Sequence, residues 1–338
     1  MVAVELITKA RSFLSSAKNP LYLFDDDADG ICAYLLLYRA FREGRAYLVK
    51  SKPHITASHA TLVRDEDALV VLDVALMDQE FVDVVKRPVL WIDHHPCQEI
   101  DKVLLVNDVS VSTAAMCYQI VKRDLWLAAV GSIDDHLWPP FIDEFKQQYA
   151  DLLGTVHDLG HARFDAPVGV IARVISFSLK GDSKTVKRSL QALQRVKSPY
   201  EILGQETVDA RWLWARYLDV HDELLKIKEQ AMRVEPEDGL WVFVYTPGRF
   251  SITKDLANEM MYRKSLPVLL LGRLRRERIV CSLRSRSDIP LATLLKTALQ
   301  GIEGYGGGHR NACGASIARE DFDRFCSNIR VLLKKYLI

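Results

Sequence analysis

The first 140 residues alternate short, continuously apolar runs with segments of helical period. Four of the runs are short enough to be strands, and they cover residues 21–24, 69–72, 89–92 and 103–106. Uninterrupted apolar runs of this length are typical of strands that are buried on both faces of a parallel sheet. Between them lie amphipathic stretches such as 31–41 and 112–121. This order predicts the βαβ arrangement of an open α/β sheet.

The rest of the chain changes pattern twice. From about residue 141 to 235 the period is helical, and the stretch 206–232 places Trp212, Ala215 and Leu218 on one face. Such a face is explained by core packing, by a connecting helix or by a dimer seam. A second α/β unit follows, with strands predicted at 240–245, 267–271 and 278–283, helices at 252–263, 291–299 and 321–336, and a glycine-rich loop before the last helix. We therefore predict a parallel-sheet domain (1–140), a helical connector (141–235) and a smaller C-terminal α/β domain (236–338).

Charge excludes a general polyanion binder. The 338 residues include 45 Lys and Arg against 44 Asp and Glu, which leaves a net charge of +1. Any nucleic-acid contact must therefore come from a local basic patch. One candidate patch surrounds a predicted hairpin and contains Arg273, Arg275, Arg276, Arg278, Arg284 and Arg286. A second basic group, which contains Lys180, Lys184, Lys187 and Arg188, flanks a loop and is expected to be a solvated surface.

The six cysteines show no CxxC pair and no regular spacing. This excludes a zinc ribbon or a disulfide framework and favours reduced, buried thiols. The N-terminal segment lacks the apolar core of a signal peptide, and no uncharged apolar run reaches the roughly 18 residues that a membrane span requires. We expect a cytoplasmic protein that makes no membrane contact.

Acidic residues follow the predicted strands of the first domain, where open α/β sheets bind ligands. The first group is Asp25-Asp26-Asp27-Ala28-Asp29-Gly30. Its Asp-x-Asp-x-Asp-Gly pattern also opens an EF-hand loop, but that loop needs a glutamate at its twelfth position and a preceding helix. The twelfth position here is Leu36, and the preceding run is a predicted strand. A calcium loop of this type is therefore excluded.

Two further groups turn the acidic turn into a predicted metal site. Asp73 ends the second apolar run, and Asp93-His94-His95 ends the third. Clustered carboxylates repel one another unless a cation neutralises them, and imidazole beside carboxylate is a good ligand for a transition metal. A fourth group, Gly131-Ser132-Ile133-Asp134-Asp135, ends an apolar helix that begins near residue 125.

Taken together, these motifs resemble the DHH phosphoesterase superfamily. The order of DxDxDG, an aspartate after a strand, DHH and a glycine-to-aspartate turn is that of the family, and the family pattern points to Asp135 rather than Asp134. The stretch 112–115 resembles the start of the helix that follows the DHH strand. Small-substrate members of the family usually carry a histidine four residues before the middle aspartate. Leu23 occupies that position and Asp25 lies two residues before Asp27, which resembles the RecJ-type nuclease branch.

The C-terminal domain carries a second resemblance. Gly306-Gly307-Gly308-His309, followed by Ala312-Cys313-Gly314-Ala315, is similar to the GGGH loop of the DHHA1 domain. Consecutive glycines let backbone amides approach an anion closely. Arg284 matches a position that contacts substrate phosphate in the family. The resemblance covers about 20–140 and 240–338, and it leaves the middle segment without a motif.

The resemblance implies a ligand set and a division of roles. Two divalent ions are expected, with Mn²⁺ preferred and Mg²⁺ or Co²⁺ as alternatives. Asp25 and Asp27 would hold one ion, Asp29, His94 and Asp135 would hold the other, and Asp73 would bridge them. His95 would contact the phosphate or the leaving group, and Asp93 would orient a histidine. The neighbouring phosphate would be held by Arg284, Gly306, Gly307, Gly308 and His309.

The implied activity is that of a single-strand-specific exonuclease on DNA, with RNA as a further substrate and 3′-to-5′ polarity. Its size is that of the compact archaeal RecJ-like nucleases, such as those associated with the fork-processing helicase Hef. This implies a role in DNA repair, a helicase or nuclease partner and a homo-oligomer. One alternative is a phosphodiesterase that cleaves oligoribonucleotides or cyclic dinucleotides, against which Leu23 counts. The other is a non-catalytic replication-fork scaffold, against which the complete ligand set counts.

Overall fold

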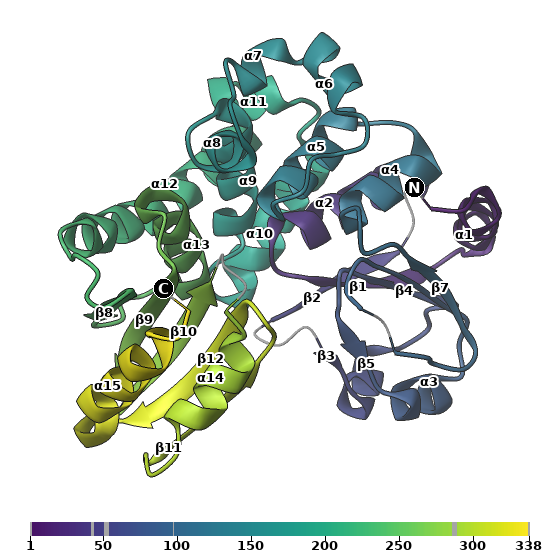
Figure 1. The fold of residues 1–338 in the computed structure, drawn as a ribbon. Helices are drawn as coiled ribbons and strands as arrows, with labels where there is room; N and C mark the ends of the chain where they lie inside the picture. Colours follow the sequence, from purple (N-terminus) through teal and green to yellow (C-terminus); the bar gives the residue numbers. More distant parts are fainter. Residues whose placement is uncertain (1, 42–43, 51–53, 97, 286–288, 337–338) are drawn as a thin grey trace. The chain divides into compact units, whose positions relative to one another are not determined.

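The computed structural model describes residues 2–41, 44–50, 54–96, 98–285 and 289–336. The chain divides into two compact units, Met1–Tyr217 and Leu218–Ile338, and the boundary falls within the long helix α12 (Val208–Met232) (Figure 1). The fold is mixed α/β in both units, as predicted from the sequence. The three-part division at residues 140 and 235 stays a prediction.

A five-stranded parallel sheet forms the centre of unit 1. Its strands lie in the order β2-β1-β4-β6-β7, with bounds β1 Pro20–Asp25, β2 Arg45–Val49, β4 Ala68–Leu72, β6 Val89–Asp93 and β7 Val103–Asn107. The four strands predicted from the apolar runs are confirmed. Strand β2 was not predicted from the sequence; it is an edge strand, and its first three residues are not buried. A two-stranded parallel sheet, β3 (His54–Ile55) with β5 (Leu76–Met77), lies apart from the main sheet.

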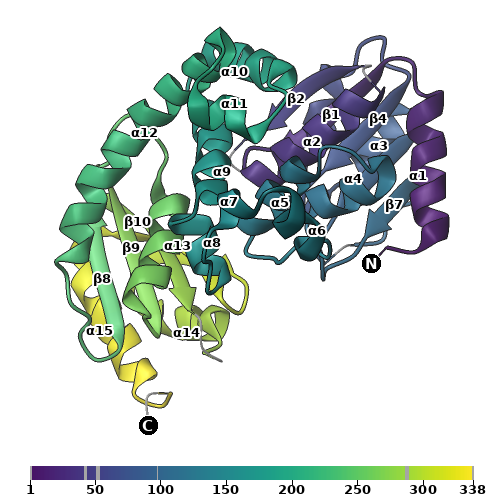
Figure 2. The same cartoon turned by 90° about the horizontal axis from the view of Figure 1, so that it is seen from above.

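Helices cover both faces of this sheet (Figures 1 and 2). On one face lie α2 (Ala28–Phe41), α4 (Thr113–Val121) and α5 (Leu125–Asp134), which pack against one another. Ten consecutive residues of α2 are buried, since the helix is enclosed by the sheet and by its neighbouring helices. The opposite face buries Phe81 of α3 (Gln79–Val85) together with apolar residues of β1, β4 and β6. Helix α1 (Val4–Ser16) packs against α4.

The middle of the chain is helical, as predicted. After α5 come α6 Ile142–Gln148, α7 Ala150–Leu153, α8 Leu159–Phe164, α9 Pro167–Ser178, α10 Ser183–Arg195 and α11 Pro199–Gly204. Helix α9 packs against α2 and α5, and α10 packs against α2. This segment is therefore part of unit 1, because it packs against the helices α2 and α5 that cover the sheet.

Unit 2 is built on a five-stranded sheet of order β11-β12-β10-β9-β8, which is antiparallel except for the parallel pair β8–β9. Its elements are β8 Leu240–Tyr245, α13 Thr253–Lys264, β9 Val268–Arg275, β10 Arg278–Ser285, α14 Leu291–Ala298, β11 Gly304–Gly308, β12 Ala312–Ala318 and α15 Phe322–Leu333. One face of the sheet packs with α14 and α15 into an apolar core. In α13, the buried Glu259 accepts hydrogen bonds from Lys228 (3.0 Å) and Arg263 (2.7 Å).

The glycine-rich segment was predicted to be a loop, and this was wrong. Residues 304–308 form the edge strand β11, which pairs with β12 from Gly304↔Ile317 to Gly308↔Cys313. Glycines carry no side chains, so their sequence cannot show the alternation by which strands are recognised. The segment is instead held as a strand by its backbone pairing with β12.

The cysteines at 32, 117, 281, 313 and 326 are unpaired and buried, as predicted, whereas Cys97 lies outside the described residues. Among the helices of the described ranges, none combines the length and the apolar character needed to cross a bilayer.

Candidate metal centre

Acidic side chains gather at the carboxyl edge of the parallel sheet, where β1, β4 and β6 end side by side. Asp25 is the last residue of β1, Asp73 follows β4, and Asp93 ends β6 just before His94 and His95. Helix α2 begins beyond Asp27, which brings Asp29 into its first turn. Asp135 caps the end of α5. Segments that are distant in sequence thus supply polar groups to one edge.

Three overlapping groups of these side chains could each hold a metal ion. They are Asp25, Asp27 and Asp73; Asp29, His94 and Asp135; and Asp73, His94 and His95. Within each group the potential ligand atoms all lie within 4.8 Å of one another. Asp73 belongs to two groups, and so does His94. Carboxylate oxygens with imidazole nitrogens suit Mn²⁺ and related divalent ions, so the donor set fits the metal that the family resemblance implies.

Asp29 is fully buried and ties α2 to α4. Its Oδ2 accepts a hydrogen bond from the backbone N–H of Thr113 (2.8 Å), and its Oδ1 accepts one from Ala114 (2.9 Å). A carboxylate has about four lone-pair sites, so these two bonds leave capacity for a cation. Burial raises the pKa of Asp29 well above its ordinary value, and the charges of Asp135 and Asp27 raise it further.

Asp73 has a left-handed backbone, with a φ of 56°. Aspartate tolerates this conformation better than most residues, and here it turns the side chain at the end of β4. Oδ1 accepts a hydrogen bond from Thr113 Oγ1 (3.1 Å), and the backbone N–H donates to Ile92 (3.0 Å). Burial, followed by the charges of neighbouring aspartates, raises the pKa of Asp73 well above its ordinary value. A divalent cation would remove the repulsion that causes the second effect.

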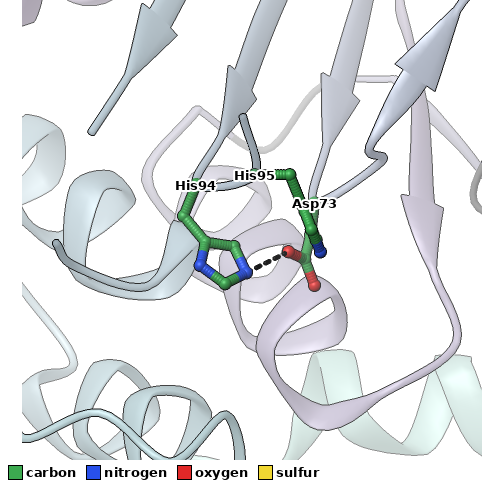
Figure 3. A group of neighbouring side chains, drawn as sticks. All are labelled: Asp73, His94 and His95. Carbon is green, nitrogen blue, oxygen red and sulfur yellow. Dashed lines mark ion pairs between the residues drawn. The ribbon is translucent and has the colours of Figure 1, made fainter. Parts of the chain in front are cut away.

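His94 lies between two of the carboxylates. Its Nε2 is 3.4 Å from Oδ1 of Asp73, an ion pair drawn in Figure 3, and 3.2 Å from Oδ2 of Asp135. The side chain is 13% exposed. The imidazole therefore joins the group at the end of β4 to the group at the end of α5.

His95 is oriented by Asp93. The imidazole Nδ1 lies 2.9 Å from Oδ1 of the fully buried Asp93, and the His95 backbone N–H donates to Oδ2 (3.1 Å). The hydrogen bond to Asp93 is the largest cause of the raised pKa of His95. Asn107, at the end of β7, donates its amide N–H groups to the backbone carbonyls of Asp93 (2.6 Å) and His95 (2.9 Å). The turn after β6 is thereby fixed from two sides.

Two glycines make the close packing around these side chains possible. At Gly131, an added Cβ would lie 2.7 Å from Cβ of Ala114 and 2.8 Å from Oδ1 of Asp29. At Gly30, it would lie 2.8 Å from the carbonyl oxygen of Asp25. Both glycines are therefore required by steric contact. They allow α5 and the acidic turn to approach one another.

The structure separates the two adjacent aspartates at the end of α5. Asp135 lies beside His94, whereas Asp134 forms an ion pair with Arg163 of α8 (3.2 Å). Sequence reasoning missed the supporting residues Thr113, Ser112 and Ser132. Ser112 caps α4 and its Oγ lies 2.8 Å from Oγ of Ser132. The stretch 112–115 had carried a signal, but only as the start of a helix.

The residues assigned to phosphate binding lie in unit 2. Arg284 of β10 pairs in register with Ala312 of β12, and the backbone N–H of His309 donates to the Ala312 carbonyl (2.8 Å). Arg284 therefore lies next to the turn that carries His309. Burial lowers the pKa of Arg284, whose Nη1 donates to the Leu283 carbonyl (2.9 Å). The other hairpin arginines are dispersed along β9, β10 and the turn between them, and Arg286 lies outside the described residues.

Two family models match this combination of segments. The model of the DHH family, N-terminal domain, matches residues 22–154, and the model of the DHHA1 domain matches residues 249–335. Together they span well over half of the chain and contain every residue of the candidate centre. The chain belongs to the DHH/DHHA1 superfamily. No curated protein sequence matches this DHH protein.

Solved structures of the same fold include RecJ nucleases. RecJ from Thermus thermophilus in complex with Mn²⁺ has a TM-score of 0.70 at 16% identity, over 98% of this chain and 55% of RecJ. The DHH protein thus spans about half the length of that relative. An exonuclease RecJ bound to manganese has a TM-score of 0.65 at 16% identity, over 96% and 94% of the two chains. A pGpG-specific phosphodiesterase, PggH from Vibrio cholerae, has a TM-score of 0.56 at 16% identity, over 94% and 99%. At such identities the likeness shows the fold.

Proposed function

We propose that this DHH/DHHA1 protein is a metal-dependent phosphodiesterase that acts as an exonuclease on single-stranded DNA, with RNA as a further substrate and with 3′-to-5′ polarity. The observation that carries the proposal is the convergence of acidic and imidazole ligand atoms within 4.8 Å in three overlapping groups. So many negative groups at one edge are costly unless divalent cations bind there.

The groups suggest how two ions would be held. Asp25 and Asp27 would hold one ion, and Asp29, His94 and Asp135 would hold the other. Asp73, which belongs to one group with Asp25 and Asp27 and to another with His94, would contribute to both. Mn²⁺ is the preferred ion, because carboxylates dominate the donor set and imidazole completes it. Bound there, two divalent ions would supply charge neutralisation at the phosphate and a water of lowered pKa as the nucleophile.

The remaining side chains position the substrate. Asp93 accepts the hydrogen bond from Nδ1 of His95 and fixes its ring, and we assign Nε2 of that ring to the phosphate or the leaving oxygen. In unit 2, Arg284 of β10 and His309, in the turn between β11 and β12, offer two donors that suit a phosphate of the backbone. A backbone bound at several phosphates is held in place for attack.

A metal titration tests the centre without relying on activity. Binding at 100 times the dissociation constant stabilises a fold by about 2.7 kcal/mol, which in a unit of this size raises the melting temperature by roughly 5–10 °C. We expect Mn²⁺ to produce this shift in the wild type and in Asp26→Asn, and to produce none in Asp73→Asn. Asp26 lies next to Asp25 in the acidic turn, is exposed and belongs to none of the three groups. The variants Asp26→Asn and Asp73→Asn each remove one negative charge and are therefore matched. Equal shifts in both variants would exclude the assigned site.

A length series of oligonucleotides labelled at the 3′ or the 5′ end, incubated with Mn²⁺, then tests the activity. An exonuclease of the proposed polarity releases labelled mononucleotides at once from the 3′-labelled strand. Cleavage confined to the shortest oligoribonucleotides or to cyclic dinucleotides would favour the alternative that PggH represents. Activity that persists in Asp73→Asn would be contamination. A protein that binds Mn²⁺ and cleaves none of these substrates would favour the scaffold alternative.

A further inference from the structure

A row of basic side chains in unit 1 begins at the same sheet edge as the candidate metal centre. Strand β2 is the neighbour of β1, and its last residue, Val49, pairs with Asp25. Lys50 follows directly and is exposed. Because neighbouring strands lie about 5 Å apart, the backbone of Lys50 is close to the acidic turn that follows β1. The positive charge therefore starts where the cluster of carboxylates ends.

The link between α9 and α10 lies against this lysine. Nζ of Lys50 donates to the carbonyl of Gly181 (3.3 Å), and Nη2 of Arg216, from α12, donates to the carbonyl of Lys180 (3.3 Å). Two cationic side chains thus bind consecutive backbone carbonyls, and the ammonium of Lys180 itself lies 5.4 Å from the ring centroid of Phe177. Figures 1 and 2 both place α10 beside β2. The link before α10 therefore lies between the end of β2 and the start of this helix.

Helix α10 continues the row on its solvent side. Lys184, Lys187 and Arg188 are exposed and stand at the i, i+3 and i+4 positions, which share one helical face. The opposite face buries Ser189, Ala192 and Leu193. The guanidinium of Arg188 lies 4.6 Å from the ring centroid of Trp212, and this contact holds the side chain in place.

Two acidic residues offset part of this positive charge, because Asp182 lies close enough to Arg216, and Asp209 close enough to Arg188, for their charges to attract each other. Asp182 is the one acidic residue between Lys180 and Arg188 in the sequence. Its carboxylate caps α10 by accepting a hydrogen bond from the backbone N–H of Thr185 (2.7 Å), so its charge is directed at the helix N-terminus. In a chain whose net charge is +1, six cations along one path are a local excess. Like charges repel one another unless an anion binds between them.

We propose that these six residues bind the phosphate backbone of the single-stranded substrate beyond the candidate centre. The set, called here the basic surface, comprises Lys50, Lys180, Lys184, Lys187, Arg188 and Arg216. The inference rests on the proposed function, since it extends the path of the same strand. A flexible, unpaired backbone can follow a turn and a helix face, and lysine and arginine contacts to phosphate require no base sequence. Through the basic surface, affinity should increase with the length of the single strand and should not depend on its base sequence.

Salt dependence of binding tests the basic surface separately from catalysis. Wild type, Lys184→Ala/Lys187→Ala and the control Lys18→Ala/Lys102→Ala are titrated with a fluorescent oligothymidylate of about 16 nucleotides, in EDTA so that no cleavage occurs. The control lysines are exposed, and they precede β1 and β7 at the opposite edge of the sheet. Each double variant removes two charges, and melting curves of all three proteins establish that they are folded.

Each phosphate contact contributes about 0.7 to the slope of log affinity against log salt for single strands. Loss of two contacts should therefore reduce the slope by about 1.4, which corresponds to a roughly 10- to 30-fold weaker affinity near 0.1 M salt. The control variant should match the wild type. Equal slopes for the two double variants, or a wild-type slope near zero, would overturn the basic surface. Because the measurement needs no turnover, failure of the exonuclease proposal would show in the cleavage assay instead.

Discussion

Replacing Gly131 with alanine adds one methyl group where α2, α4 and α5 meet beside the candidate centre. The new Cβ would lie 2.7 Å from Cβ of Ala114, 2.8 Å from Oδ1 of Asp29 and 3.3 Å from Cα of Asp29. Neither neighbour can move cheaply. The Ala114 methyl is fixed to the backbone of α4, and Oδ1 of Asp29 accepts a hydrogen bond from the Ala114 N–H. Relief of the contact must therefore separate the helices or displace the carboxylate.

Two opposing terms set the size of the effect. Glycine to alanine within a helix gains about 1 kcal/mol of helix propensity. Overpacking of a tight interior costs roughly 1–3 kcal/mol, and two contacts below 3.0 Å place this site in the upper part of that range. The net loss should be about 1–2 kcal/mol, which corresponds to a fall of roughly 2–8 °C in the melting temperature of a unit of this size. Because a shift of about 1 Å in a positioned group can cost 100-fold, we expect activity to fall by about 10- to 100-fold.

The assay combines thermal unfolding followed by circular dichroism with cleavage of a labelled oligonucleotide in Mn²⁺. Ala114→Gly provides the matched partner for a double-mutant cycle, because it removes the 2.7 Å contact and leaves the one with Asp29. The double variant should recover stability relative to the sum of the single changes, by about 0.5–3 kcal/mol, and should not recover activity. A Gly131→Ala protein that melts at or above the wild-type temperature and cleaves at the wild-type rate would refute the reasoning.

Three further outcomes follow from the contacts described above. Asp93→Asn should reduce cleavage about 10- to 100-fold while the Mn²⁺-induced rise in melting temperature persists, and loss of that rise would make Asp93 part of the metal site. Gly308→Ala should lower the melting temperature, because at a φ of 150° the added Cβ would lie 2.4 Å from a backbone oxygen of β12. Gly307→Ala should leave the melting temperature unchanged, because its added Cβ would have no neighbour within 4 Å. Equal shifts in the two variants would contradict this packing. Burial raises the pKa of Glu259, but the hydrogen bond from Arg263 and other positive contacts lower it by more, so the net pKa lies below the ordinary value of 4.5. The ionised Glu259 therefore stabilises the fold above pH 4.5, and this stabilisation is lost as the pH falls through the lowered pKa. Glu259→Gln should therefore melt below the wild type at pH 7, with a difference that shrinks in acid, and a difference independent of pH would exclude the ion pair as its cause.

The positions of the site residues could be predicted where they directly follow a strand that is recognisable in the sequence. Asp73 and Asp93 follow continuous apolar runs, and the carboxyl ends of parallel strands are where ligands bind, so the edge was predictable from local pattern. The choice of Asp135 over Asp134 came from the family pattern. In the structure, Asp135 lies beside His94, and Asp134 pairs with Arg163.

Contacts between distant segments could not be predicted in this way. The hydrogen bond from Thr113 to Asp29 joins residues 84 positions apart, and nothing near either residue indicates it. Strand β11 was missed because its glycines give no alternation, and β2 because an edge strand buries little. Likewise, Lys184 and Lys187 were expected from the sequence to be solvated charges. Their relation to the candidate centre depends on the pairing of β2 with β1, which joins segments that are distant in sequence.

The arrangement of the candidate centre has a consequence for how the protein matures. Its ligands begin at Asp25 and end at Asp135, and they converge only after the successive parallel strands have paired. Parallel pairing between distant segments closes long loops and is slow, so the ability to bind a metal should arise late in folding. During synthesis, a nascent chain that has not yet exposed α5 would lack part of the ligand set. Capture of Mn²⁺ would then report that the first unit has reached its native topology.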